Sequence, residues 1–467
     1  MRSERLWRGV AIALCALVPG SFYLLGDATD AFPGVLTITP QEERNTARPP
    51  AQAEDWERTV SPLPMASPAA ALPAPEASTD LAARMNAHAN LPVVNGNLSY
   101  AVVDAATGTL IAERDSRVAR TPASTLKLLT AAAVLRLYDE DDTLTTRIVL
   151  TDNTVTLEGH GDMLLSRQDL TALATQVAAE AKKQGLAEVT VALDDTALPG
   201  GENPAWGDNG RAGGWVAPTA ALAVDRGRLD GSPYGAKSAD PALDAARAFS
   251  QELTAQGVKV TGKVTRQKAP QNGTEFLHQS MPIGQIVRHT LLVSDNTTAE
   301  LLGHLVALAH GKEAQPASAA TAVHDEIVTL GRELGLPQEH LDALVIRDCS
   351  GLSKENQVPP GLLAAVTANV ASGAVPQLEQ ILYDVPIAGY SGTLAKRFRA
   401  DDTIPGRGMV RGKTGYLNGT ASLTGVTVMP DGRTVGYAIL VHGFDGANAK
   451  EARAAVDKVA TEIVTEH

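Results

Sequence analysis

The spacing of apolar and polar residues predicts that the two ends of this chain build one β-sheet. Apolar stretches over residues 98–104 and up to Ala112 are separated by a turn at 106–108, which is the pattern of a β-hairpin. Near the C-terminus the same reasoning predicts three strands, at 409–416, 421–429 and 434–441. A turn at 430–432 joins the last two strands, and a closing amphipathic helix follows at 447–466. Together these segments predict a central antiparallel sheet flanked by helices.

A helical pattern follows the first hairpin. Thr121 is a good N-cap and Pro122 a good first helical residue, and apolar side chains then fill nearly every position up to Leu135. A helix that is apolar on nearly all sides has to be surrounded by protein, so we expect it to be central and buried.

The middle of the chain alternates its elements differently. Strands over 147–157, 189–193 and 258–264 are interleaved with helices over 169–184 and 241–256. This order predicts a small α/β domain, residues 144–268, inserted into a domain formed by residues 79–143 and 269–467. The expected fold class is therefore mixed α/β (α+β), with one antiparallel sheet and one insertion.

The first residues have the pattern of a targeting segment. Arg2, Arg5 and Arg8 precede an uncharged apolar run, so residues 1–26 are typical of a signal peptide or of a membrane anchor. Residues 27–78 are rich in Ala and Pro and cannot bury enough apolar surface to offset their ordering entropy, so we expect a disordered tether. The body is then expected to be exported, to the outer face of the cytoplasmic membrane, the cell-wall space or the medium.

Charge and cysteine content limit the partners of that body. A net charge of -13 gives a long-range field of the wrong sign for nucleic acid or anionic lipid, so we expect membrane contact only through the N-terminal segment. Cys15 lies in the apolar run, which leaves Cys349 unpaired and expected to be buried. His160 and Asp162 suggest metal ligands, but the glycines around this histidine are typical of a turn and no second histidine lies at ligand spacing. No metal or organic cofactor is implied.

Three short motifs carry the candidate chemistry, and the first is Ser124 with Lys127. At the start of a buried helix, free amides and the positive dipole end can receive an oxyanion, and Lys127 shares a helix face with the hydroxyl. Desolvation, together with the like charge of Lys413, is expected to lower the pKa of Lys127 so that it takes the serine proton. The alternative is an ordinary capped helix with an exposed lysine.

The second motif, Ser294-Asp295-Asn296, separates two apolar helices over 282–293 and 297–309. In the functional interpretation, Ser294 passes a proton to a leaving amine and Asn296 hydrogen-bonds a substrate amide. In the alternative, the three residues only cap the two helices.

The third motif is Lys413-Thr414-Gly415, on a predicted strand. Gly415 allows an extended peptide to add to the sheet edge, where Lys413 and Thr414 would bind a terminal carboxylate. The backbone N–H groups of Ser124 and Tyr416 would form an oxyanion hole. The alternative is that Lys413 is an ordinary solvent-exposed lysine on a strand. Because each motif has such an alternative, the prediction depends on the order and the context of all three.

In this order the motifs resemble the penicilloyl serine transferases, and four further segments narrow the likeness to the D-alanyl-D-alanine carboxypeptidase/endopeptidase family, the class C low-molecular-mass penicillin-binding proteins. These segments are Asp348-Cys349-Ser350-Gly351-Leu352-Ser353, residues 388–394 with Arg397-Phe398, residues 159–162 and residues 221–225. The likeness covers the chain from about Asp80 to the C-terminus.

The resemblance implies a transpeptidase-like fold with an insertion between the first two motifs. It also implies that Ser124 is acylated with Lys127 as base, and that Ser294, Asn296, Lys413 and Thr414 occupy the remaining active-site positions. Two residues depart from the family pattern: Cys349 replaces a glycine and Tyr416 a small residue. The insertion is also shorter than in the larger members, so a third domain is expected to be absent or reduced.

The sequence therefore predicts an exported serine-type D-Ala-D-Ala carboxypeptidase that also acts as a DD-endopeptidase. Its expected partners are peptidoglycan stem peptides ending in D-Ala-D-Ala, with β-lactams as covalent inhibitors. A β-lactamase is one alternative, but it needs a base for deacylation and no Glu-x-x-Leu-Asn segment is present. A scaffold that binds cell wall is another, disfavoured because every nominal catalytic position holds a competent residue.

Overall fold

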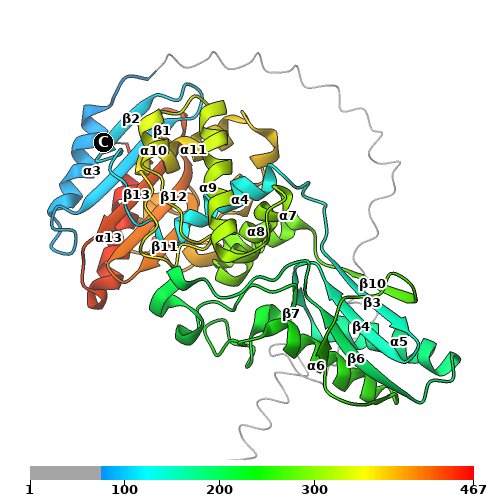
Figure 1. The fold of residues 1–467 in the computed structure, drawn as a ribbon. Coiled ribbons are helices and arrows are strands. Elements are labelled where there is room, and N and C mark those ends of the chain that lie inside the picture. Colours follow the sequence, from blue (N-terminus) through cyan, green and yellow to red (C-terminus); the bar gives the residue numbers. More distant parts are fainter. Residues whose placement is uncertain (1–74, 467) are drawn as a thin grey trace, which may run out of the picture. The chain divides into compact units, whose positions relative to one another are not determined.

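The structure is a computed structural model that describes residues 75–466 (Figure 1). The expected targeting segment at 1–26 and nearly all of the expected tether at 27–78 lie outside the described residues. The described residues form one compact unit.

One five-stranded antiparallel sheet joins the two ends of the described chain. Its order is β11-β12-β13-β1-β2, so the N-terminal hairpin pairs directly with the C-terminal one. The strands are β1 Leu98–Asp104, β2 Leu110–Arg114, β11 Arg411–Leu417, β12 Thr420–Val428 and β13 Thr434–His442. The predicted antiparallel sheet is confirmed, and β11, which carries the third motif, lies at its edge.

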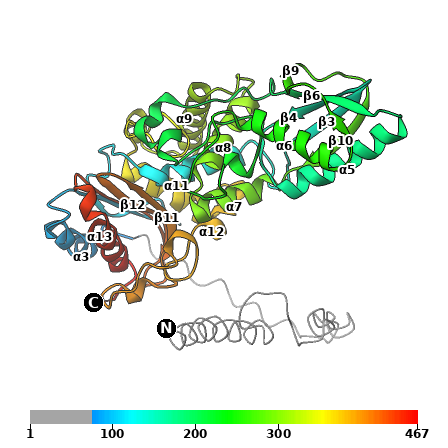
Figure 2. The same cartoon turned by 90° about the horizontal axis from the view of Figure 1, so that it is seen from below.

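Helices cover both faces of this sheet (Figures 1 and 2). Helix α11 (Pro360–Ser372) packs on one face, and α3 (Thr79–Ala87) and α13 (Ala449–Glu462) pack on the other. Alternate residues of β1 divide between these two layers: Ala101 joins the core beneath α11, whereas Tyr100 joins the core beneath α3 and α13. The alternating side-chain direction along β1 thus contributes residues to two separate cores.

The apolar helix after the first hairpin lies at the centre of the larger core, as predicted. A short 3-10 turn, η3 (Ala123–Leu126), leads into α4 (Lys127–Leu135), and all nine residues of α4 are buried. The helices around it are α7 Ile283–Val293, α8 Asn296–Ala309 and α9 Pro316–Glu333. Every face of α4 therefore meets protein, which explains why no polar face appears in its sequence.

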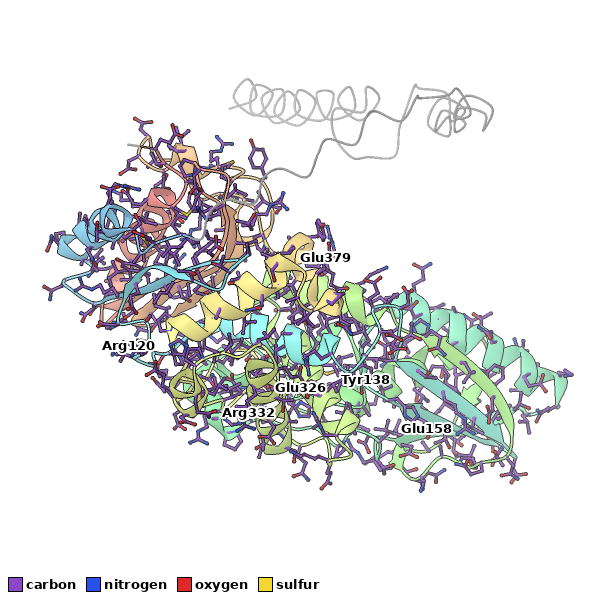
Figure 3. The ribbon with its side chains drawn as sticks, turned by 90° about the horizontal axis from the view of Figure 1, so that it is seen from above. Arg120, Tyr138, Glu158, Glu326, Arg332 and Glu379 are labelled. Carbon is purple, nitrogen blue, oxygen red and sulfur yellow. The ribbon has the colours of Figure 1, made fainter. Side chains whose placement is uncertain are left out.

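The predicted cap of this helix is wrong. The Thr121 hydroxyl donates to the carbonyl oxygen of Lys354, and no side-chain cap closes the turn that begins at Ala123. Ala123 has a φ of +50°, which turns the backbone sharply just before Ser124. The approach to this turn is held by a β-bridge between Arg120, labelled in Figure 3, and Val358. Tertiary contacts replace the local cap.

The middle of the chain forms a mixed six-stranded sheet, which carries Glu158 of Figure 3. Its strands are β3 Thr145–Thr151, β4 Thr154–Gly159, β6 Glu188–Asp194, β8 Lys259–Val260, β9 Thr265–Arg266 and β10 Thr274–Gln279. Helices α5 (Arg167–Lys183) and α6 (Pro241–Ala255) accompany it. The predicted fold class, a helix-flanked antiparallel sheet with an α/β insertion, is confirmed.

Three details of the insertion differ from the prediction. The strand expected at 147–157 is two strands, because Asp152 adopts a φ of +54° and reverses the chain. The strand expected at 258–264 is interrupted at Gly262, whose φ is +76°. The sheet also continues past residue 268, since β10 pairs with β3 along its length. Turn residues inside apolar stretches account for the first two differences.

The remaining elements are short. A two-stranded parallel sheet consists of β5 Asp162–Leu165 and β7 Leu222–Val224. Two small helices, α10 Gln338–Asp342 and α12 Ile381–Asp384, complete the described secondary structure other than 3-10 turns. Within residues 75–466 no single helix has the length and apolar character of a membrane span; Pro360–Ser372 and Pro376–Asp384 would meet both criteria together, but they are bent by 104°.

The contact between Gly303 of α8 and Cys349 yields a stability prediction. A Cβ atom on Gly303 would overlap the Sγ atom of Cys349, which is fully buried. We expect Gly303→Ala to lower the free energy of unfolding by about 1–3 kcal/mol, measured by denaturant titration. In the double variant with Cys349→Gly the two changes should compensate in part, whereas simple additivity of their costs would contradict the packing argument.

Candidate active site

Ser124 lies where the edge strand of the sheet meets the buried helix. It belongs to the turn η3, directly before α4, and two glycines from other segments press against it. A Cβ on Gly415 of β11 would lie 3.1 Å from the Ser124 nitrogen and 2.8 Å from the Pro122 oxygen. A Cβ on Gly351 would also lie 3.1 Å from the same nitrogen. Both positions need glycine because the backbone of the serine turn leaves no room for a side chain.

The amine of Lys127 contacts three oxygens. Its Nζ lies 2.9 Å from Ser124 Oγ, 2.8 Å from Asn296 Oδ1 and 2.6 Å from the carbonyl oxygen of Ser350. The Asn296 amide orientation is consistent, because its Nδ2 donates to the carbonyl oxygen of Trp215 at 3.0 Å. Two of the three oxygens can only accept, so a neutral Lys127 would use its two hydrogens on them and direct its lone pair at the serine hydroxyl.

Burial shifts this lysine toward its neutral form. The Lys127 side chain is fully buried, and desolvation lowers its pKa from 10.5 to about 8, although Asp348, Glu300 and Asp295 act to raise it. We expected the charge of Lys413 to contribute to this lowering. Instead, it is the pKa of Lys413 that is held well below its usual range, mainly by burial and in addition by the charge of Lys127.

The second and third motifs meet through Lys413 and Ser294. Lys413 Nζ donates to Ser294 Oγ and to the Thr414 carbonyl oxygen, both at 2.8 Å. Ser294 has a φ of +63° at the end of α7, which directs the following residues into α8. Lys413 itself is fully buried and is absent from the walls of the cavity described below. Its direct effect therefore falls on its neighbours, Ser294 and Thr414.

Asp295 has the capping role that the sequence offered as an alternative. Its carboxylate accepts from the backbone N–H of Thr298 at the start of α8, and it pairs with Arg228 at 2.8 Å. Burial opposes ionisation, but the hydrogen bonds and the nearby arginines hold the pKa of Asp295 well below its usual range. The capping alternative therefore holds for Asp295, while Ser294 and Asn296 contact the lysines Lys413 and Lys127.

A cavity of about 410 Å³ opens over this cluster. Ser124, Ser294, Asn296, Thr414, Gly415 and Tyr416 line it, as do Asn209, Trp215, Tyr234, Val293, Leu352, Thr393, Arg397, Leu417, Asn418 and Arg453. The hydroxyls of Thr414 and Thr393 lie 2.7 Å apart. The structure thus brings all the residues predicted for the site to one place, with the two lysines beneath the cavity surface.

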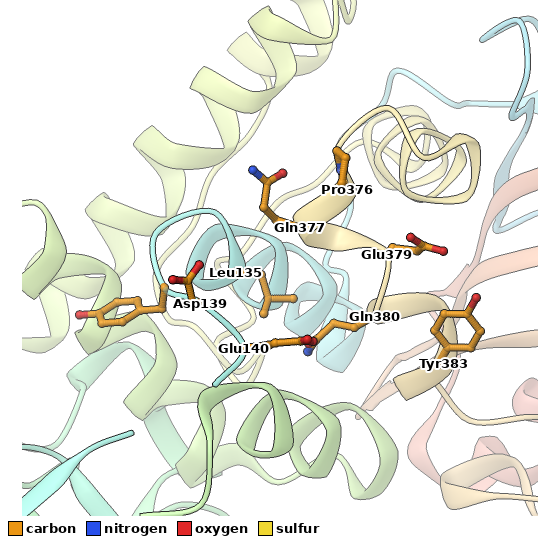
Figure 4. Close-up of a pocket in the computed structure, with 9 residues that line it drawn as sticks. Leu135, Asp139, Glu140, Pro376, Gln377, Glu379, Gln380 and Tyr383 are labelled. Carbon is orange, nitrogen blue, oxygen red and sulfur yellow. The ribbon is translucent and has the colours of Figure 1, made fainter. Parts of the chain in front are cut away.

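A second hollow, of about 540 Å³, opens elsewhere on the protein (Figure 4). It is lined by Leu135, Tyr138, Asp139, Glu140, Pro376, Gln377, Glu379, Gln380 and Tyr383. Leu135 is the last residue of α4, whereas Ser124 precedes its first, so this hollow has no part in the serine chemistry. Within residues 75–466 no group of three His, Cys, Asp or Glu side chains is arranged to hold a metal ion.

Comparison with known proteins identifies the family. The model of the D-Ala-D-Ala carboxypeptidase 3 (S13) family matches residues 81–234 and 229–463. The chain belongs to this family. The predicted resemblance and the predicted enzyme class, a D-Ala-D-Ala carboxypeptidase, are thereby confirmed.

Relatives of this S13 carboxypeptidase share most of its length. The carboxypeptidase DacB of Mycolicibacterium smegmatis is 30% identical over 97% of this chain and 97% of its own. A carboxypeptidase of Mycobacterium tuberculosis is 32% identical over 77% of this chain and 79% of its own. The crystal structure of penicillin-binding protein 4 from Haemophilus influenzae has the same fold, with a TM-score of 0.62, 21% identity, and coverage of 78% of this chain and 94% of its own.

Sequence reasoning missed one residue of the S13 site, Glu300. Fully buried on α8, it accepts hydrogen bonds at 3.0 Å to 3.3 Å from the backbone N–H groups of Cys349 and Ser350 and from the indole of Trp206. It thereby holds the loop whose Ser350 carbonyl accepts from Lys127. The sequence did contain a signal for Glu300. It is the only acidic residue in a mostly apolar helix, and it follows Asn296 by four residues, so its side chain has to lie on the same helix face as Asn296.

Glu300 also yields a prediction about stability and pH. Burial, and next the charge of Asp348, raise the pKa of Glu300 well above its ordinary 4.5. The folded protein then keeps a proton that the unfolded chain loses, so the contribution of Glu300 to stability is intact below about pH 4.5 and declines as the pH rises above it.

We expect Glu300→Gln to remove this decline, because glutamine keeps an acceptor for the three donors and carries no charge. Denaturant titrations between pH 5 and pH 8 should therefore show the variant gaining stability relative to the wild type as the pH rises. Glu300→Ala, which leaves the donors unpaired, should be less stable than Glu300→Gln at every pH by about 1–3 kcal/mol. A difference between Glu300→Gln and wild type that stays constant with pH would contradict the assignment.

Proposed function

We propose that this protein removes the terminal D-Ala from peptidoglycan stem peptides that end in D-Ala-D-Ala, through an acyl-enzyme on Ser124. The observation that carries the proposal is the Lys127 amine, 2.9 Å from the Ser124 hydroxyl and fully buried, with a pKa lowered to about 8. An amine of that pKa is neutral in a minority of molecules near physiological pH, far more than an ordinary lysine with a pKa of 10.5, and this neutral form can take the proton from serine. Membership of the S13 family supplies the substrate class.

The reaction has two chemical steps. Lys127 takes the hydroxyl proton while Ser124 Oγ bonds to the carbonyl carbon of the penultimate D-Ala, and the peptide C–N bond then breaks. The leaving D-Ala amine receives a proton passed through Lys127 and Ser294. In the second step water attacks the ester, Ser124 Oγ leaves with a proton, and the shortened peptide departs as a carboxylic acid.

The remaining residues of the three motifs orient the peptide. In the proposal Asn296 donates to a substrate amide carbonyl, and Gly415 lets the peptide backbone add to the edge of β11. The N–H groups of Ser124 and Tyr416 stabilise the oxyanion, since Gly415 brings the strand against the serine turn. Lys413 and Thr414 favour a terminal carboxylate: Thr414 directly from the cavity wall, and Lys413 by polarising Ser294 and Thr414 from below.

The same acyl-enzyme extends the proposal to two further reactions. A cross-link whose D-Ala carbonyl is bonded to another peptide's amine presents the same bond, so DD-endopeptidase activity is included. A β-lactam amide presents a similar carbonyl but a leaving group that stays tethered, so we expect penicillin to remain bonded to Ser124. Because stem peptides lie outside the cytoplasm and residues 1–26 have a targeting pattern, the proposed location is the cell-wall side of the membrane.

Substitution of the nucleophile tests the proposal. Ser124→Ala should release D-Ala from an acetylated peptide ending in D-Ala-D-Ala at least about a thousandfold more slowly than the wild type. Intact-protein mass spectrometry after penicillin exposure should show one adduct on the wild type and none on Ser124→Ala. The same spectrum reports the mature N-terminus and so tests export.

Exposed Ser372, at the end of α11, provides the matched control, because Ser372→Ala makes the same change far along the chain from the three motifs. It should retain both D-Ala release and labelling. Full labelling of Ser124→Ala would refute the assigned nucleophile. Absent D-Ala release with strong binding to cell wall would favour the scaffold, and sustained fast turnover of nitrocefin, in place of a burst followed by slow turnover, would favour the β-lactamase.

The pKa of Lys127 predicts a pH profile for acylation. Since only the neutral amine accepts the serine proton, the rate constant for acylation by penicillin should rise about tenfold per pH unit below pH 8 and level off above it. Stopped-flow measurements with a fluorescent penicillin between pH 6 and pH 9.5 would define the midpoint. A rate that is constant from pH 6 to pH 9.5 would exclude Lys127 as the titrating base.

A further inference from the structure

The charges that line the catalytic cavity are all of one sign. Among the described residues that form its walls, only Arg397 and Arg453 are charged, and none is acidic. The chain as a whole has a net charge of -13, so this positive lining is a local departure from the overall field. Such a lining favours an anion in this cavity over a neutral group of the same shape.

The two arginines are not equivalent. Arg397 donates to both carboxylate oxygens of Asp457, at 2.6 Å and 3.1 Å, so its charge is already compensated. Arg453 forms no ion pair with any carboxylate of the described residues. Its guanidinium carbon lies 4.4 Å from the centre of the Tyr416 ring, a cation–π contact that restrains a side chain otherwise exposed to solvent. Arg453 is therefore the uncompensated cation of the cavity.

Tyr416 connects this arginine to the reacting atoms. It follows Gly415 on β11, and the same residue supplies the backbone N–H proposed for the oxyanion hole. Its ring therefore holds the guanidinium at the wall of the same cavity, which the hydrogen-bonded Thr414 and Thr393 also line. Lys413, by contrast, is fully buried below the surface with its amine on Ser294 and Thr414. Among the described residues that line the cavity, the positive charge without a carboxylate partner thus belongs to Arg453.

We propose that Arg453, held over the ring of Tyr416, is a specificity-determining residue that selects substrates with a free terminal carboxylate over substrates whose terminus is a neutral amide. The inference rests on the proposed function, since it concerns the leaving residue of the same peptide. A guanidinium can donate two parallel hydrogen bonds to a carboxylate, which a carboxamide cannot accept in the same way. Tyr416 in place of a small residue then restrains the arginine instead of simply narrowing the cleft.

The test compares two substrates that differ only at the terminus. One is an acetylated peptide ending in D-Ala-D-Ala with a free carboxylate, and the other is the same peptide ending in a carboxamide. In Arg453→Gln we expect kcat/KM for the acid to fall about tenfold, mainly through KM, because a partly exposed charge pair is screened by water. We expect kcat/KM for the amide to change by less than about twofold, so the preference for the acid should largely disappear.

Lys450 supplies a matched control on the same helix. It is exposed, lies three residues before Arg453, and does not line the cavity, so Lys450→Gln removes one positive charge without removing the contact. We expect its preference for the acid to equal that of the wild type. Penicillin acylation of Ser124 measured in parallel shows that each variant keeps an intact nucleophile.

The outcomes separate the two proposals. If the wild type releases no D-Ala from the acid peptide, the proposed function is wrong. If the wild type is active and Arg453→Gln keeps the wild-type ratio of acid to amide kcat/KM, the inference is overturned while the function stands. Equal losses in Arg453→Gln and Lys450→Gln would also overturn it, because they would assign the preference to the general field of α13. Loss of the preference in Arg453→Gln alone would support it.

Discussion

The site depends on burying one amine whose only direct partners are uncharged oxygens. Lys127 is enclosed on α4, and its three contacts come from a hydroxyl, a side-chain amide and a backbone carbonyl. Removing the amine from water without a directly bonded carboxylate is costly for the charged form, and that cost is what brings its pKa within reach of neutrality. Acidic side chains lie in the surroundings without a direct hydrogen bond to the amine, and they only moderate the lowering of its pKa.

That constraint explains why distant segments have to meet at one point. Asn296 comes from the start of α8, Ser350 from a loop tied to Glu300, and Ser124 from a turn wedged against Gly351 and Gly415. If one oxygen were displaced, a neutral Lys127 would have a free hydrogen and no defined direction for its lone pair. The packing of glycines, the buried glutamate and the strained backbone at Ala123 are all means of holding these oxygens in place.

Much of this could be predicted from the sequence, because the motifs are local and the elements are strongly periodic. The apolar character of α4, the apolar stretch of β1 and the turn before β13 were sufficient to predict the antiparallel sheet and its central helix. The cap at Thr121 failed because a long-range hydrogen bond took its hydroxyl, which no local pattern reveals. The Ser350 carbonyl could not be predicted either, since every residue has a carbonyl and only the fold decides which one faces the lysine.

The pairing of β1 with β13 has a consequence for the order of assembly. β1 lies inside the sheet, yet one of its two neighbours belongs to the last part of the chain. Until those final residues emerge, β1 exposes an unpaired edge and α4 lacks the sheet and α11 layers that close its core. Long-range pairing of this kind slows folding, because the entropy of closing a long loop is lost before the stabilising contacts between the strands can form. The sheet of residues 75–466 therefore closes only when β13 becomes available to pair with β1.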